Sequence, residues 1–224
     1  MENVLITGTS SGIGRNTAEL FLSKGKYHVY GLDIRPAVVE DPNYTHIVCD
    51  VGKQEQLPEL PNINYLINNA GTIYEKDAIE SNLMGYIYVA EKYAFNPDIK
   101  SVLNIGSISG TDGLDTPIYA ASQGGRISYT KNLMLRLSKT KHVPVNILCF
   151  GAVMTGLEPK LYAQQDLVDA VANESVLKKW IMPDEAAEWV YFMSVLNKSM
   201  CGQVLLVDNG ESVNRNFIDA RNNE

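Results

Sequence analysis

Seven short apolar runs, separated by longer segments of helical pattern, constrain the fold of this chain most. The runs occupy residues 4–7, 28–33, 45–51, 63–69, 101–107, 143–150 and 203–208. They are rich in β-branched residues and nearly continuous in apolar character, which is typical of parallel strands covered on both faces. Helical patterns lie between them at residues 13–24, 78–95, 118–139 and 185–196. This alternation predicts an α/β protein with a doubly wound parallel sheet of about seven strands and helices on both faces.

The length and charge of the chain narrow its possible partners. With 224 residues, of which 45% are hydrophobic, we expect one core and a single domain over residues 1–224. A formal net charge of −7, with no cluster of Lys and Arg, argues against a nucleic-acid partner. No apolar run approaches the length of a membrane span, and a strand that begins at Val4 leaves no room for a signal segment. We therefore expect a cytoplasmic protein with no membrane partner.

The cysteines and histidines give no sign of a disulfide or a metal site. Cys49, Cys149 and Cys201 are far apart, and each lies in an apolar, strand-like run. Buried free thiols are the expected state of all three. The three histidines are dispersed and lack the spacing of metal ligands, so no metal is expected.

The turn TGTSSGIG, residues 7–14, carries the most specific chemical signal. It follows a predicted strand and opens a predicted helix. Gly8, Gly12 and Gly14 can then allow a tight turn, a close backbone approach to a pyrophosphate, and close helix–strand packing. The free N–H groups of the helix N-terminus would face the phosphates. The alternative is an ordinary glycine-rich turn, but the strand, turn and helix context favours a dinucleotide site.

Asp33 ends the next predicted strand, 19 positions after Gly14. A carboxylate there can accept hydrogen bonds from an adenosine ribose and would repel a 2′-phosphate, which favours NAD over NADP. Ser11 supplies no cation to offset this preference. Arg35, two residues past the strand, is the exception, because it can swing toward a 2′-phosphate. The alternative for Asp33 is a residue of a surface turn.

Further motifs follow the glycine turn in a fixed order. They are CDV at 49–51, INNAG at 67–71, NLMG at 82–85, NIGSISG at 104–110, IYAAS at 118–122, FGAVMT at 150–155 and CGQVLLVDNG at 201–210. With these motifs the chain resembles the short-chain dehydrogenase/reductase family, compact type, essentially from end to end. The resemblance implies a Rossmann-type fold and an NAD(H)-dependent oxidoreductase that interconverts a carbonyl and an alcohol.

The resemblance also assigns residues to the cofactor. The implied cofactor-binding residues are Gly8, Ser10, Ser11, Gly12, Ile13, Gly14, Asp33, Ile34, Asp50, Val51, Asn69, Ala70, Gly71, Gln123, Gly151, Val153 and Thr155. Among them, Asp50 and Val51 correspond to the family's adenine contact, and Thr155 lies in the stretch that contacts nicotinamide. Phe150 departs from the family, which usually has proline at the start of that stretch.

The implied catalytic residues are Asn82, Ser107, Tyr119 and Gln123. A carbonyl that accepts hydride at carbon needs one positioned acid and one donor to polarise its oxygen. Tyr119 would be the acid and Ser107 the polarising donor, while Asn82 would hold a water or a backbone kink in the proton relay. Each has a structural alternative: Ser107 can simply end a strand, Asn82 can cap or bend a helix, and Tyr119 can be a core or interface aromatic.

Position 123 is where the chain departs most from the family. The resemblance implies a lysine one helical turn after the tyrosine, which bonds the nicotinamide ribose and lowers the tyrosine pKa through its charge. Gln123 can keep the hydrogen bond but not the charge. The loss should fall hardest on alcohol oxidation, in which Tyr119 must act as a base, and less on ketone reduction.

Arg126 lies on the same helical face as Tyr119 and Gln123, at i+7 and i+3. Helical side chains lean toward the helix N-terminus, so Arg126 should point back toward position 123. Two hypotheses remain open. Arg126 partly restores the positive field at Tyr119, or it turns aside to a carboxylate at a subunit contact.

Three further segments carry expectations about the surroundings of the site. Residues 152–182 resemble the family's mobile substrate lid, although they can equally be ordinary amphipathic helices packed on the core. Residues 213–224 form a polar C-terminal tail. The two long helices, 78–95 and 118–139, resemble those that form homodimers and homotetramers in the family, and the alternative is that their apolar faces pack in the core of the same chain.

Gln123 leaves the function open between several interpretations. We favour an NAD(H)-dependent oxidoreductase acting on a small-molecule carbonyl or alcohol. The main alternative is a non-catalytic dinucleotide-binding sensor or assembly protein, because a fold does not fix a function. A lysine deliberately replaced to trap a ligand, or chemistry other than carbonyl/alcohol hydride transfer, are the remaining possibilities.

Overall fold

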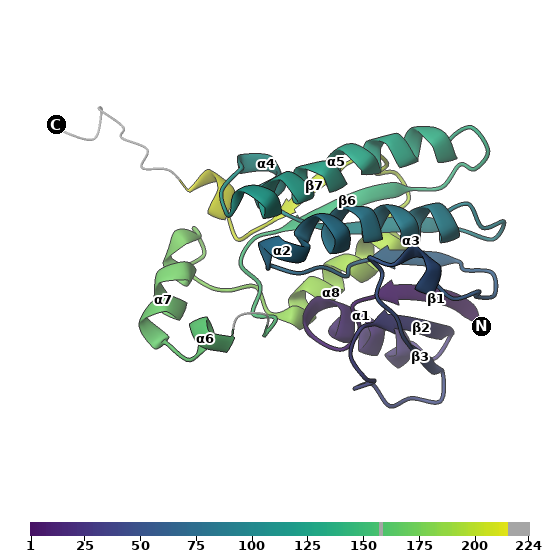
Figure 1. Ribbon diagram of the computed structural model, residues 1–224, viewed down its shortest axis with the longest axis horizontal. Coiled ribbons are helices and arrows are strands. Elements are labelled where there is room, and N and C mark those ends of the chain that lie inside the picture. Colours follow the sequence, from purple (N-terminus) through teal and green to yellow (C-terminus); the bar gives the residue numbers. More distant parts are fainter. Residues whose placement is uncertain (157–158, 215–224) are drawn as a thin grey trace.

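A computed structural model describes residues 1–156 and 159–214 of the chain. Its centre is one sheet of seven parallel strands in the order β3-β2-β1-β4-β5-β6-β7 (Figure 1). The strands are β1 Glu2–Thr7, β2 Tyr27–Asp33, β3 Tyr44–Val48, β4 Tyr65–Asn68, β5 Ser101–Ser107, β6 Val145–Phe150 and β7 Val204–Val207. The predicted single-domain, doubly wound sheet of seven strands is therefore confirmed.

The strand order reverses between β1 and β4. The chain builds outward from β1 through β2 to β3, then crosses back to place β4 on the other side of β1. In open parallel sheets of this kind, the two crossovers leave in opposite directions and open a crevice at the carboxyl ends of the strands. The glycine turn, which follows β1, lies at that reversal.

Helices and helical turns connect the strands. They are α1 Gly12–Ser23, η1 Gln54–Gln56, α2 Glu75–Asp77, η2 Ala78–Met84, α3 Gly85–Tyr93, α4 Ser109–Asp112, α5 Pro117–Leu137, α6 Pro159–Tyr162, α7 Gln165–Glu174, α8 Pro183–Tyr191, η3 Phe192–Leu196 and η4 Glu211–Val213. Of these, η1 and η4 are 3₁₀ turns, and η2 and η3 have the wider π-helical hydrogen bonding.

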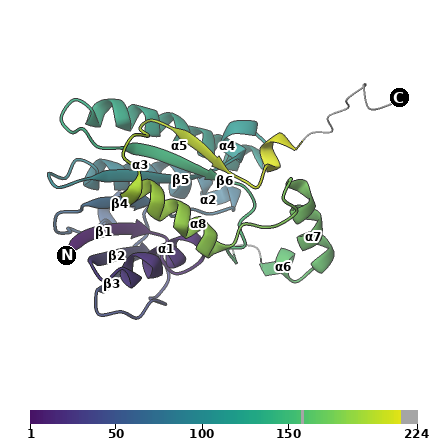
Figure 2. The same ribbon diagram turned by 180° about the vertical axis from the view of Figure 1, so that it is seen from behind.

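Each face of the sheet has its own apolar layer. In β1, Val4 and Ile6 face a cluster that includes Phe21 of α1 and Val190 of α8. Leu5, between them, faces the opposite cluster with helices α3 and α5. All three strand residues are fully buried, as the continuous apolar runs predict for strands covered on both sides. Figures 1 and 2 show α3 and α5 on one face of the sheet and α1 and α8 on the other.

The structure corrects several sequence-based expectations. The helix expected over 78–95 begins earlier, at Glu75, and contains the π-helical segment η2. Cys49 and Cys149 are buried free thiols as expected, but Cys201 is exposed, because it lies in the turn that precedes β7 rather than in the strand. Of the expected lid, residues 157–158 lie outside the described residues, as do residues 215–224 of the expected tail.

Close packing of α4 on α5 gives a test of this arrangement. A Cβ added to Gly110 would lie 2.7 Å from the backbone carbonyl carbon of Gln123, whereas a Cβ on Gly124 would meet its nearest neighbour at 3.6 Å. We predict that Gly110→Ala lowers the free energy of unfolding by about 1–3 kcal/mol through overpacking. Gly124→Ala should leave it unchanged or raise it by up to about 1 kcal/mol, since alanine favours helix. Urea denaturation of both variants checks this, and equal effects would contradict the packing.

Candidate active site

One large cavity lies at the carboxyl ends of the strands, where the strand order reverses. Its volume is about 1260 Å³, above the roughly 300–1000 Å³ of pockets that hold one drug-sized ligand. Residues that follow β1, β2, β3, β4, β5 and β6 all line it. Because parallel strands present their carboxyl ends at one edge, motifs far apart in the sequence meet here.

Nearly all residues predicted for the site border this cavity. The lining includes Gly8, Ser11, Gly12, Ile13, Asp33, Ile34, Asp50, Val51, Asn69, Ala70, Gly71, Asn82, Ser107, Tyr119, Gln123, Gly151, Val153 and Thr155. Two predicted residues, Ser10 and Gly14, are not in the lining. Ser10 instead donates its backbone N–H to the Asp33 carboxylate at 2.9 Å, and Gly14 is buried beneath the turn. Ser10 therefore positions Asp33, and Gly14 allows α1 to pack closely against the glycine turn.

The glycine turn has the geometry that its sequence predicts. Gly8 has a φ of +79°, a conformation that residues with a Cβ rarely adopt. A Cβ on Gly14 would lie 2.1 Å from the carbonyl oxygen of Gly8, so the helix can pack against the strand only with glycine there. Ser11 precedes α1 and makes no side-chain cap. The first N–H groups of α1 therefore point to the cavity edge without a capping side chain, which makes this helix end suitable for an anionic group.

Asp33 is buried at the end of β2, and protein donors hold both of its carboxylate oxygens. Oδ2 accepts from the backbone of Ser10, and Oδ1 accepts from the backbone N–H of Arg35 at 2.9 Å. The Arg35 guanidinium reaches across, donating from Nε to Asp33 at 3.4 Å and from an Nη to Ser11 Oγ at 2.6 Å. The acid and the exposed cation thus border the same corner of the cavity.

The loop after β4 is fixed from the first strand. The Thr7 hydroxyl accepts from the backbone N–H groups of Asn69 and Ala70, at 2.9 and 2.8 Å. The Asn69 side chain in turn donates to the carbonyl of Thr7 at 2.8 Å. These bonds explain why the INNAG motif ends in a rigid turn at the cavity wall rather than in a flexible loop.

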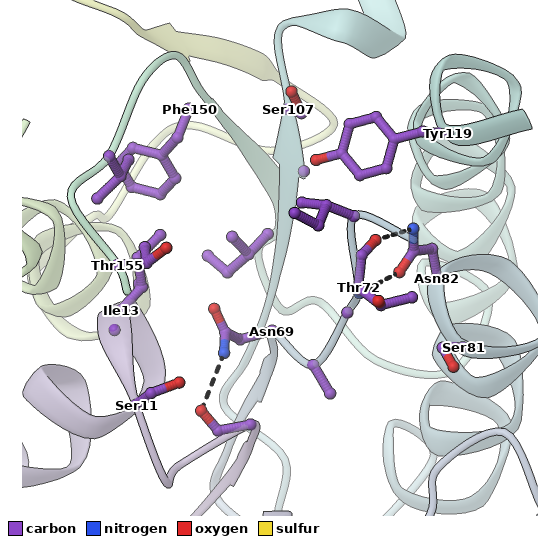
Figure 3. A pocket seen from close by; sticks show the side chains of 18 of the residues that line it. Ser11, Ile13, Asn69, Thr72, Ser81, Asn82, Ser107, Tyr119, Phe150 and Thr155 are labelled. Carbon is purple, nitrogen blue, oxygen red and sulfur yellow. Dashed lines mark hydrogen bonds between the residues drawn. The ribbon is translucent and has the colours of Figure 1, made fainter. Parts of the chain in front are cut away.

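Ser107 ends β5 and Tyr119 lies in the first turn of α5, and their hydroxyl groups lie at the same end of the cavity, away from Ser11 (Figure 3). Burial raises the pKa of the Tyr119 phenol, and the nearby Asp115 carboxylate and Cys149 thiol also raise it. The Arg126 guanidinium and a hydrogen bond from Ser107 lower the same pKa. Burial is the largest of these effects on the pKa, so the Tyr119 phenol stays protonated at neutral pH and can donate its proton.

Asn82 is fully buried in the π-helical segment η2. Its carboxamide donates to the carbonyl of Thr72 at 2.9 Å and accepts from the N–H of the same residue at 2.8 Å (Figure 3). It also donates to Ser122 Oγ at 3.3 Å. Asn82 therefore holds the loop after β4 against α5. The wider π turn is where its own backbone carbonyl becomes an acceptor for Arg126.

Gln123 and Arg126 are both buried, each with 3% of its surface exposed. The Gln123 side-chain oxygen has no hydrogen-bond partner. Arg126 donates to the backbone carbonyls of Asn82, Ile105 and Ala70. Among the described residues, no carboxylate lies within ion-pair distance of it. Within the described residues Arg126 therefore turns to backbone carbonyls rather than to a carboxylate, and the carboxylate at a subunit contact stays a hypothesis from the sequence.

Comparison with known proteins identifies the family. Residues 2–166 match the family described as short chain dehydrogenase. The chain belongs to that family. Carbonyl reductase family member 4 of Xenopus laevis is 30% identical over 92% of this chain and 95% of its own. The 3-oxoacyl-[acyl-carrier-protein] reductase FabG of Rickettsia felis is 28% identical over 92% of this chain and 95% of its own.

Solved structures show the same fold for this short-chain dehydrogenase. The ligand-free aldohexose dehydrogenase of Thermoplasma acidophilum superposes with a TM-score of 0.86 at 25% identity, covering 97% of this chain and 96% of that one. ElxO with NADP bound has a TM-score of 0.82 at 24% identity, covering 94% and 98% of the two chains. The family and the oxidoreductase class of its relatives agree with the resemblance drawn from the motifs.

Some residues of this short-chain dehydrogenase's cavity were not predicted as site residues. Thr72 lines it because Asn82 fixes its backbone, and no motif marks that position. Glu211, in η4, reaches the cavity and accepts from the backbone N–H of Ala152 at 2.9 Å. Its pKa is raised, mainly by burial. Only the folding of the chain after β7 back onto the loop after β6 brings Glu211 there.

Residues from the expected lid also border the cavity. Leu161 of α6, Val171 of α7 and Trp180 line it, together with Tyr162. The Tyr162 and Trp180 rings meet edge to face at 5.7 Å, and Trp180 donates to the carbonyl of Val168 at 2.9 Å. No residue of α7 is buried, so this helix is not part of the core. Figures 1 and 2 show α6 and α7 projecting beyond the carboxyl ends of the strands.

Neither a cluster of metal ligands nor a membrane-spanning helix occurs among the described residues. In residues 1–156 and 159–214, no three His, Cys, Asp or Glu side chains are grouped so as to hold a metal ion. Over the same residues, no helix has the length and apolar character needed to cross a bilayer.

The hydrogen bonds of Asn82 predict a measurable stability loss. Asn82→Ala would leave the half-buried backbone N–H and carbonyl of Thr72 without their side-chain partner, which costs about 1–3 kcal/mol. Ser81→Ala, one residue earlier and half-buried, is the control and should stay within about 0.5 kcal/mol of the unmodified protein. Thermal and urea unfolding compare the two. A neutral Asn82→Ala would show that the carboxamide does not hold the loop.

Proposed function

We propose that this short-chain dehydrogenase uses NAD(H) to interconvert a carbonyl and an alcohol on a small molecule. The observation that carries the proposal is the meeting of Ser107 and Tyr119 in the same cavity that the glycine turn borders. The named activities of the relatives support it, since a carbonyl reductase, a 3-oxoacyl reductase and an aldohexose dehydrogenase all act on carbonyl or hydroxyl groups.

The residues present fit a nicotinamide dinucleotide. The N-terminus of α1 offers backbone N–H groups to the pyrophosphate, and the glycine turn before it permits a close approach to the backbone. At the other end, the unpaired side-chain oxygen of Gln123 is a buried acceptor that borders the cavity, suited to a ribose hydroxyl. When bound, this cofactor exchanges a hydride with the substrate carbon.

Tyr119 and Ser107 carry out the proton transfer that accompanies hydride transfer. In the reductive direction, the Tyr119 phenol donates its proton to the carbonyl oxygen while the Ser107 hydroxyl donates a hydrogen bond to the same oxygen. In the oxidative direction, the Tyr119 phenolate takes the proton of the alcohol. Because burial raises the pKa of Tyr119, the phenol predominates at neutral pH in the absence of ligands. Reduction is therefore the direction that the free site favours.

Asp33 supports NAD rather than NADP as the cofactor. A buried carboxylate that borders the cavity suits a ribose diol and repels a 2′-phosphate. Arg35 favours the second candidate, NADP, because its guanidinium bridges Asp33 and Ser11 at that corner. We propose NAD, because Asp33 is held in place by backbone donors whereas the Arg35 side chain is half exposed.

We further propose that residues 152–182 close over the substrate, with α6 and α7 as the moving part. Closure would exclude water from hydride transfer. A cytoplasmic location and a homodimer or homotetramer stay predictions from the sequence.

Replacing the acid gives the most direct test. Tyr119→Phe should lower kcat for carbonyl reduction at least about 100-fold, because it removes the proton donor, and should leave the Kd for NADH within about threefold. Tyr74→Phe is the matched control, since Tyr74 also lines the cavity but is largely exposed. NADH fluorescence measures binding, and absorbance at the nicotinamide band follows turnover on a panel of ketones and aldehydes. Binding of NADH without turnover of any substrate by the unmodified protein would favour the sensor.

Cofactor choice has its own test at the corner formed by Asp33 and Arg35. We expect NADH to bind more tightly than NADPH. Asp33→Ala should lower the ratio of the NADPH Kd to the NADH Kd by at least about tenfold, because the repulsion of a 2′-phosphate is lost. Arg35→Ala is the companion variant. If NADPH binds as tightly as NADH and Arg35→Ala weakens NADPH alone, the cofactor is NADP.

A further inference from the structure

Position 123 poses a charge problem within the proposed function. The resemblance to the family implies a lysine there, and Gln123 brings no charge. Its side chain is nevertheless buried and borders the cavity, and its oxygen lacks a partner in the protein. An acceptor left unpaired in a buried position is costly, so this oxygen is suited to a donor that a ligand supplies.

Hydrogen bonds to three backbone carbonyls, each from a different element, hold the Arg126 guanidinium in place. Nε donates to the carbonyl of Asn82 in η2, one Nη donates to Ile105 of β5 at 2.7 Å, and the other donates to Ala70, after β4, at 2.8 Å. All three acceptors are backbone carbonyls, which carry partial rather than full negative charge. The guanidinium therefore keeps a net positive charge inside the protein, at the wall of the cavity.

The surroundings are shaped for this cation. The guanidinium carbon lies 4.9 Å from the centre of the Tyr86 ring, a distance at which the ring face attracts a cation. A Cβ on Gly71 would lie 2.9 Å from an Nη of Arg126 and 2.9 Å from the side-chain oxygen of Asn82. Glycine at position 71 thus leaves the room that the guanidinium occupies. Burial lowers the pKa of Arg126, but arginine stays protonated in proteins.

We propose that Gln123 and Arg126 divide the two roles of the single lysine that the family resemblance implies. Arg126 is a positioning residue that supplies the positive field at Tyr119, and Gln123 supplies the hydrogen bond to a ribose hydroxyl of the dinucleotide. This inference rests on the proposed function, in which Tyr119 is the acid.

The groups that face Tyr119 agree with this division. Arg126, seven residues along α5, lowers the Tyr119 pKa, as does Ser107 at the end of β5. Asp115, in the loop before α5, and Cys149, in β6, raise it. Arg126 is thus the cation in this set. Burial lowers the pKa of Arg126, and Tyr86, Tyr119 and Cys149 partly offset that lowering. The effect of Tyr119 on Arg126 is the counterpart of the effect of Arg126 on the Tyr119 pKa.

A matched pair of substitutions separates charge from architecture. Arg126→Lys and Arg126→Gln both lose the three-carbonyl fork, and only Arg126→Lys keeps a charge. We expect both to lose stability to a similar extent, while only Arg126→Gln raises the Tyr119 pKa. Reduction needs the protonated phenol and oxidation needs the phenolate, so both limbs of the pH profile of kcat/KM should move to higher pH in Arg126→Gln. Alcohol oxidation at pH 8 should fall about tenfold per unit of pKa.

Substitutions at Gln123 test the second role, the hydrogen bond to the ribose. Gln123→Met should weaken NADH binding about tenfold and leave the Tyr119 pKa unchanged, whereas Arg126→Gln should leave NADH binding within about threefold. Gln123→Lys should restore the pH profile of Arg126→Gln. In the otherwise unmodified protein it should lower the Tyr119 pKa by less than about half a unit, because the positive field is already present. A lowering by more than about one unit there would overturn the proposal.

The titration of Tyr119 is also measured without turnover. Tyrosine ring-carbon NMR from pH 8 to 11.5, with Tyr119→Phe to assign the signal, reports its pKa in each variant. Equal shifts in Arg126→Lys and Arg126→Gln, or no shift in Arg126→Gln, would show that Arg126 acts only as a structural fork. If the unmodified protein reduces no carbonyl with either cofactor, the proposed function fails, while this titration still decides whether Arg126 controls Tyr119.

Discussion

All seven strands run in the same direction, and the rest of the structure depends on that constraint. Each strand must be reached by a crossover, so helices cover both faces and the carboxyl ends of the strands meet at one edge. The glycine turn after β1, Asp33 at the end of β2 and Ser107 at the end of β5 gather there for this reason. Predicted site residues that are more than 140 positions apart in the sequence, from Gly8 to Thr155, therefore line one cavity.

Within that cavity, Arg126 joins pieces that the sheet alone does not fix. It bonds to the loop after β4, to β5 and to the π-helical segment η2. Asn82 supplies one of these carbonyls, and its side chain clamps Thr72. The asparagine and the arginine therefore support one another, and together they set the wall opposite the glycine turn. A buried charge held only by carbonyl dipoles would be unfavourable in most proteins, which makes a role at the neighbouring phenol a physical reason for its presence.

The sequence predicted much of the fold and of the site, for identifiable reasons. Continuous β-branched runs predicted parallel strands, and the structure confirms all seven, although the edge strands β3 and β7 contain no buried residue. Gly8 and Gly14 were predicted from the glycine pattern between a strand and a helix, and the structure gives the reason for them, since Gly8 has a φ of +79° and a Cβ on Gly14 would lie 2.1 Å from the Gly8 carbonyl oxygen. The earlier start of the helix at Glu75, the exposure of Cys201 and the places of Thr72 and Glu211 were not predicted. Each of these depends on how loops pack, and loop packing leaves no periodic pattern in a sequence.

By itself, the sequence determined the alternation of strands and helices, the glycine turn, the order of Ser107 and Tyr119 that resembles the short-chain dehydrogenase family, and the departure from it at Gln123. These are local properties, because propensity, periodicity and motif spacing act over a few residues. Only the tertiary structure decided the environment of Arg126. The sequence left two hypotheses for Arg126, a positive field at Tyr119 or a carboxylate partner at a subunit contact. Its three carbonyl acceptors and the Tyr86 ring come together only when α5 packs against β5, the loop after β4 and η2. Charge in a protein interior depends on what lies within a few ångströms in space, and that distance is set by the fold rather than by neighbours in the chain.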